Sequence, residues 1–183
     1  GLAYVPFVYR DAFGEWDSYR VAAGVLEAVR DDASVGESGI RNNSVSYAYS
    51  FLLLAFGDAV RRDPTSLYPI MNYVNVIAAT LATLPFLVVM RRYFGLTAAV
   101  GATLTLIVVP VWWNLALYAH PMMPAALVFL CALAAVGLRD RFVRATGSSA
   151  AGIAVDAAVV GLLALTLMFR LDAVLLFPML TAC

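Results

Sequence analysis

Residues whose side chains could do chemistry are concentrated before residue 67, and the densest group combines acids, aromatic rings and an arginine. The group reads Glu15-Trp16-Asp17-Ser18-Tyr19-Arg20. A carboxylate within hydrogen-bond reach of a hydroxyl can accept its proton during a reaction. An arginine offers a planar, permanently charged fork of donors that suits phosphate. We therefore take this stretch as the candidate site.

A short amphipathic helix is expected to carry this group. Apolar residues recur at helical spacing at Val21, Val25, Leu26 and Val29, as on a helix with one buried face. Asp17 or Ser18 is a natural N-cap for such a helix, so an ordinary capping role competes with a catalytic one. Residues 31–43 are polar and contain glycine, which predicts a loop.

An aromatic segment at residues 44–60 is shorter than a full membrane span. It carries Tyr47, Tyr49 and Phe51, and rings of this kind concentrate at the headgroup level of a bilayer. We expect a helix lying at the membrane interface that ends at Gly57-Asp58, a typical stop signal. A short span is the alternative, and it would invert the side of residues 1–43.

The chain after residue 66 consists of membrane-length apolar runs. A bilayer core of about 30 Å needs roughly 20 apolar residues in a helix, and only helices satisfy their backbone groups there within one segment. The sequence therefore predicts an all-α polytopic membrane protein with residues 1–66 as a loop carrying two interfacial helices. Its spans are expected at about 67–90, 96–118, 121–138 and 151–169, with a truncated run at 171–183. We expect a fragment of a larger protein.

Composition supports the membrane class and argues against several functions. Hydrophobic residues make up 63% of the chain and charged residues 13%, against about 45–50% and 25% in soluble domains. A net charge of zero argues against nucleic acid binding, which needs a basic stripe. Cys131 and Cys183 lie in apolar runs and are interpreted as buried small hydrophobes. With a single histidine, His120, a zinc site is not expected.

Charges between the runs predict the orientation in the membrane. Two loops hold five arginines against Asp140, a net of +4, whereas residues 1–66 hold nine acids and six arginines, a net of −3. Because arginine-rich loops stay in the cytoplasm, we expect residues 1–66, the His120 turn and the Arg170 turn on the external face. All twelve lysine-plus-arginine residues are arginine, which we interpret as the codon bias of a high-GC genome. The expected location is a prokaryotic plasma membrane. Asp156, inside its run, is interpreted as a structural or helix-start residue.

The order of these segments resembles the N-terminal half of the GT-C membrane glycosyltransferases, the superfamily of protein O-mannosyltransferases and aminoarabinose transferases. The likeness covers nearly the whole chain and rests on the order of the segments and on their general residue character. It is carried by the acidic-aromatic motif, the aromatic helix ending in Phe-Gly-Asp58 and three further stretches. These stretches are Arg-Arg-Tyr-Phe-Gly95, Tyr118-Ala-His120-Pro-Met-Met-Pro124 and Phe169-Arg-Leu-Asp-Ala-Val-Leu-Leu-Phe-Pro178.

The resemblance implies a catalytic acid in the first external loop, just before a helix. Asp17 matches best, with Glu15 and Asp11 as alternatives. Family members often carry another acid in the second external loop, where this chain has His120. That departure puts a two-carboxylate or metal-binding mechanism in doubt. We expect no cofactor, and a divalent metal stays an open alternative.

The resemblance further implies transfer of a sugar from a polyprenyl phosphate to an acceptor on the external face, in contact with membrane lipid. Arg170 and Arg20 would then bind the phosphate, and His120, Trp16 and Tyr19 complete the expected substrate contacts. Arg170 beside Asp172 could equally be an interfacial anchor. The protein, lipid or glycan nature of the acceptor is left open. The alternatives are a transporter or permease fragment and a non-catalytic GT-C-like paralogue.

Overall fold

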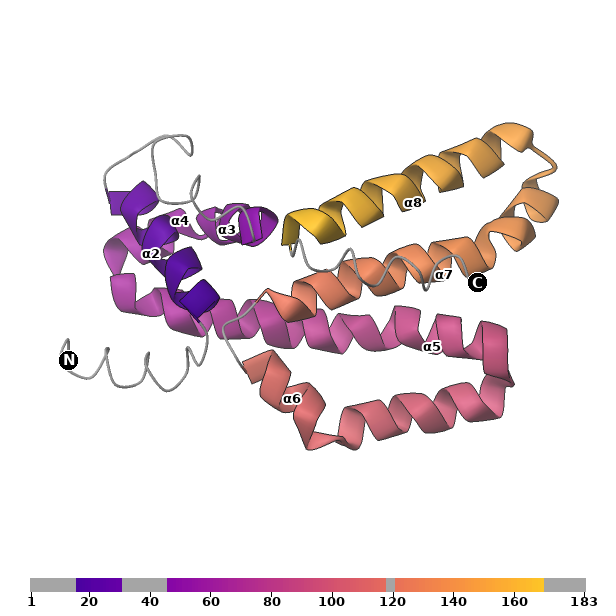
Figure 1. The fold of residues 1–183 in the computed structure, drawn as a ribbon, viewed down its shortest axis with the longest axis horizontal. Helices are drawn as coiled ribbons and strands as arrows, with labels where there is room; N and C mark the ends of the chain where they lie inside the picture. The colour runs from indigo at the N-terminus through magenta and orange to yellow at the C-terminus, as the bar shows by residue number, and fades with distance from the viewer. Residues whose placement is uncertain (1–15, 31–45, 118–120, 170–183) are drawn as a thin grey trace.

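The computed structural model describes residues 16–30, 46–117 and 121–169, and these are almost entirely helical. No strand occurs within those ranges. Two pairs of long antiparallel segments form the body of the molecule, and short helices cover one of its ends (Figure 1). This arrangement agrees with the all-α fold expected from the sequence.

Short helices make up the described part of residues 1–66. They are α2 (Trp16–Arg30), α3 (Tyr47–Leu54), α4 (Gly57–Arg62) and the 3-10 turn η2 (Pro64–Ser66). Gly57 begins α4. The Phe-Gly-Asp sequence therefore separates α3 from α4, and the helical region does not end there as expected. Asp63 caps η2, because its carboxylate accepts hydrogen bonds from the backbone N–H and the hydroxyl of Thr65. These two bonds lower the pKa of Asp63.

The first long segment, α5 (Leu67–Val108), turns back on itself at Gly95. Gly95 has φ 83° and ψ 172°, a region that is essentially restricted to glycine. In Figure 1 the helix therefore runs away from the short helices, bends, and returns toward α6 (Pro110–Leu117). The bend falls between the first two predicted spans.

The second pair consists of α7 (Met122–Thr146) and α8 (Ser149–Phe169). Gly147 ends α7 in the left-handed conformation, with φ 60°, as is common just after a helix. Helix α7 packs against both α5 and α8. It continues past residue 138, so Arg139, Arg141 and Arg144 lie on a helix and not in a loop.

Three helices in the described part of the chain are long and apolar enough to cross a membrane. They are Pro64–Val108, which contains the bend, Met122–Thr146 and Ser149–Phe169. Many of their large side chains face outward, among them Leu84, Leu104 and Ile153 at 57–70% exposure. Outward apolar side chains on helices of this length are expected in an integral membrane protein.

Candidate functional site

Helix α2 carries the acidic-aromatic motif in its first turn. It begins at Trp16, so Asp17 and Ser18 lie inside the helix and the prediction that one of them is the N-cap is wrong. Trp16, Asp17 and Tyr19 are placed here by their backbone, and their side chains lie outside the described part of the structure.

The remaining predicted site residues are placed only in part. Arg20 is exposed on α2. Glu15, Asp11, His120 and Arg170 lie outside the described residues, so their roles stay predictions.

One buried apolar cluster joins α2 to α7 and α8, the helices next to the predicted site residues in the sequence. Val21, at 1% exposure, and Val25, at 0%, pack from α2 into a cluster that includes Ala125 of α7 and Phe169 of α8. The predicted spacing of apolar residues on α2 is thus confirmed, with Leu26 only partly buried against the cluster. Burying these side chains fixes α2 across one end of the long helices.

Two of the predicted positions are close in the sequence to members of this cluster. Asp17 is one helical turn before Val21, and Arg170 directly follows Phe169. His120 precedes Pro121, whose side chain is fully buried at the start of α7. The fold therefore brings together Val21 and Phe169, the cluster members nearest in the sequence to Asp17 and Arg170.

A buried polar contact that the sequence did not reveal links α3 to α5. The Tyr49 hydroxyl lies 3.2 Å from Asn75 Oδ1 and 3.3 Å from the Met71 carbonyl oxygen, both acceptors for its hydrogen. Tyr49 and Asn75 are both 0% exposed, so the Tyr49 ring packs inside the protein. Burial raises the pKa of the Tyr49 hydroxyl, and the bond to Asn75 offsets this only in part.

A small cavity of about 290 Å³ lies beside the C-terminal half of α2, between that helix and α3–α4. Its lining includes Ala28 and Val29 of α2 and the charged residues Asp58 and Arg61 of α4. Ala28 is eleven residues beyond Asp17, which corresponds to about 16 Å along a helix axis. The cavity is therefore separate from the predicted catalytic position.

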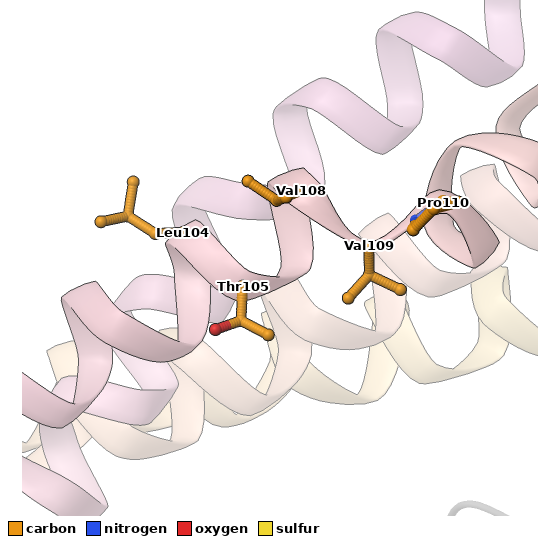
Figure 2. A pocket seen from close by; sticks show the side chains of 5 residues that line it. All are labelled: Leu104, Thr105, Val108, Val109 and Pro110. Carbon is orange, nitrogen blue, oxygen red and sulfur yellow. The ribbon is translucent and has the colours of Figure 1, made fainter.

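A second hollow, of about 450 Å³, lies where α5 gives way to α6 (Figure 2). It is lined by Leu104, Thr105, Val108, Val109 and Pro110. The only hydroxyl among them, on Thr105, already donates to the Gly101 carbonyl oxygen at 2.9 Å. An apolar lining of this kind suits acyl chains and offers no charged group for a phosphate.

Metal ligands do not cluster within residues 16–30, 46–117 and 121–169, where no group of three histidine, cysteine or acidic side chains could hold an ion. Comparison of the chain with protein-family models, curated proteins and solved structures gives no match.

Proposed function

We propose that this chain is part of a GT-C-like glycosyltransferase that moves a sugar from a polyprenyl-phosphate donor to an acceptor on the external face of a prokaryotic plasma membrane. In this proposal α2, α3 and α4 lie outside and the long helices span the bilayer. The donor and the surrounding membrane lipid are its partners, together with an acceptor that is a protein, a lipid or a glycan.

The observation that carries the proposal is the cluster that joins α2 to the ends of α7 and α8. Val21 and Phe169 are buried in it together. Asp17 lies one helical turn before Val21, and Arg170 directly follows Phe169, so both residues are attached to the chain close to this cluster. Catalysis needs a base and a leaving-group site held together around one substrate. Both would lie at a membrane surface, where a lipid-linked phosphate resides.

The chemistry follows from the residue types. Asp17 accepts the proton of the acceptor hydroxyl while that oxygen forms a bond to the anomeric carbon of the sugar. The bond from this carbon to the phosphate oxygen breaks, and polyprenyl phosphate leaves with the electron pair. Arg170 and Arg20 stabilise the departing phosphate, while Trp16, Tyr19 and His120 contact the substrates. No cofactor is required for this step.

Exchange of Asp17 for asparagine tests the proposal in the full protein. Asp17→Asn preserves size and removes the ability to take a proton, so transfer from a polyprenyl-phosphate sugar should fall by about 10²–10⁴-fold. Membrane insertion and abundance should stay near those of the unmodified protein. Glu15→Gln, the matched control, should do much less.

The result is read against that control. If Glu15→Gln abolishes transfer and Asp17→Asn does not, Glu15 is the base. Full activity in both variants, and in Asp11→Asn, rejects the carboxylate mechanism. Absence of transfer in the unmodified protein with any polyprenyl-phosphate sugar favours a non-catalytic paralogue or a transporter. Activity that disappears with a chelator and returns with a divalent cation would add a metal to the mechanism.

A transporter remains the second candidate because of the interruption between α5 and α6. Val109 is extended, with φ −67° and ψ 120°, and Pro110 begins the next helix. Transporters often build their sites at interrupted helices within the membrane. The surroundings of this interruption are apolar, whereas transporter sites present polar groups to their substrate, so we favour the glycosyltransferase.

A further inference from the structure

Arginines gather at the end of the helical body opposite to α2, α3 and α4. The bend of α5 and the turn between α7 and α8 lie together at that end (Figure 1). Five arginines occur next to these turns, namely Arg91, Arg92, Arg139, Arg141 and Arg144. With Asp140 and Asp156 as the neighbouring acids, the end carries a net charge of +3.

Two of the five already have internal partners. Arg139 of α7 donates two hydrogen bonds to the carboxylate of Asp156 in α8, with N–O distances of 2.6 and 2.8 Å. The Nε of Arg144 donates to the carbonyl oxygen of Asp140 at 3.1 Å, which leaves the positive charge of Arg144 unneutralised. Within the described ranges, Arg92 and Arg141 form no ion pair.

Close packing between α5 and α7 places Arg92 beside the other exposed arginines. A Cβ atom built on Gly137 of α7 would lie 3.5 Å from Cγ of Arg92, so the Arg92 side chain runs against α7 at this glycine. Arg141 and Arg144 follow Gly137 by four and seven residues, spacings that share one helix face. Arg92, Arg141 and Arg144 therefore form one surface, which we call the arginine face.

Aromatic rings border the arginine face. Tyr93 and Phe94 at the bend and Phe142 on α7 are 42%, 66% and 50% exposed. Aromatic side chains of membrane proteins concentrate at the level of the lipid headgroups. Guanidinium groups at the same level would face the phosphates of the nearest leaflet.

From this arrangement we infer that the arginine face binds the headgroup of an anionic phospholipid. Its guanidinium groups donate to the lipid phosphate, and their excess positive charge selects an anionic headgroup over a zwitterionic one. The acyl chains lie along the apolar outer surface of α5 and α7. This inference is independent of the proposed sugar transfer, which takes place at the opposite end of the molecule.

Lipid titration of the purified full chain, followed by native mass spectrometry, tests the inference with phosphatidylglycerol and phosphatidylcholine as probes. The unmodified protein should retain phosphatidylglycerol preferentially. Each juxtamembrane arginine near an anionic surface changes binding about fivefold, so Arg92→Gln/Arg141→Gln should weaken phosphatidylglycerol binding by roughly 25-fold. Phosphatidylcholine binding should change little.

The matched control removes two arginines from the other end of the molecule. Arg61→Gln/Arg62→Gln changes the net charge equally, and it should leave the preference intact because both residues lie on α4. An unchanged preference in the first variant, or an equal loss in the control, overturns the inference. If the first variant does not fold, the inference is tested with the unmodified protein alone. Its preference for phosphatidylglycerol should fall as the salt concentration rises. A preference that does not depend on salt, or no preference, rejects lipid binding by the arginine face.

Discussion

Tyr49 of α3 and Asn75 of α5 meet in a fully buried contact, with the tyrosine hydroxyl 3.2 Å from Asn75 Oδ1. The residues are 26 positions apart in the sequence. Their contact attaches the short helices to the first long helix, beside the apolar cluster that holds α2. A buried hydroxyl that lacks a hydrogen-bond partner destabilises the folded state more than an exposed one does. The contact with Asn75 therefore specifies how α3 lies on α5.

Tyr49→Phe should destabilise the protein by about 1 kcal/mol, because it removes the hydroxyl from a buried hydrogen-bonded position while keeping the ring. The free energy of unfolding in detergent, followed by loss of helicity, measures this effect. Tyr73→Phe is the control on α5, since Tyr73 is 69% exposed, and it should change stability by only a few tenths of that value. Equal effects from the two substitutions would contradict the role of the contact.

Alkaline pH should weaken the fold through Tyr49. Burial raises the pKa of this hydroxyl above its ordinary value of 10.0, so the folded state holds the proton more tightly than the unfolded state. The stabilisation is fully present below pH 10 and is lost as the pH rises above it. The chain contains no lysine, which removes the commonest competing titration in this range.

The measurement is the midpoint of thermal unfolding between about pH 8 and pH 11, the interval around the ordinary tyrosine pKa. The midpoint of the unmodified protein should fall more steeply above pH 10 than that of Tyr49→Phe. Parallel curves for the two proteins would show that another group causes the alkaline loss.

Gly95 and Gly101 offer a matched test of the bend in α5. An added Cβ would meet nothing within 4 Å at either position, but only Gly95 has a positive φ, 83°. Gly95→Ala should therefore destabilise the protein by about 1–3 kcal/mol through backbone strain alone. Gly101→Ala should stabilise it by about 0.5–1 kcal/mol, since alanine favours a helix interior. Chemical unfolding of both variants measures the difference, and two effects of the same sign would contradict it.

The helical fold, with helices long and apolar enough to cross a membrane, could be predicted from the sequence because long apolar runs admit few other structures. The sequence also predicted the buried face of α2, since Val21, Val25 and Val29 show a local periodicity. Helix ends were harder to predict. Arg139 and its neighbours suggested a loop, yet α7 continues to Gly147, whose left-handed conformation ends it. A glycine after several residues with good helix propensity was the available signal.

Contacts between distant segments could not be predicted from local pattern. Tyrosine is a residue type that is common at membrane interfaces. Only the packing of α3 on α5 shows that the hydroxyl of Tyr49 is bonded to Asn75. Asp156 was expected to have a structural role, and its bidentate pair with Arg139 agrees with that expectation. The residue types alone did not identify Arg139 as the partner of Asp156, because three arginines of α7 lie within one and a half helical turns.

The Arg139–Asp156 pair should fix the register of α7 against α8. Asp156→Arg brings two like charges together and should lower the midpoint of thermal unfolding by several degrees. Arg139→Asp/Asp156→Arg restores opposite charges and should recover most of that loss. Thermal unfolding of the single and double variants in lipid nanodiscs gives the coupling between the two sites. Additive losses in the double variant would show that the pair does not hold the hairpin.

Orientation in the membrane gives the last prediction, since the proposed site must be external and the arginine face cytoplasmic. Single cysteines at Arg62 on α4 and at Ser148 between α7 and α8 mark opposite ends of the molecule. They are placed in a background in which Cys131 and Cys183 are replaced by alanine. An impermeant thiol reagent should label position 62 in intact cells, and position 148 only after permeabilisation. This result follows from the excess of arginine at the α7–α8 turn, because positive residues resist translocation. The reverse pattern would place α2 and Asp17 in the cytoplasm and remove the basis for sugar transfer on the external face.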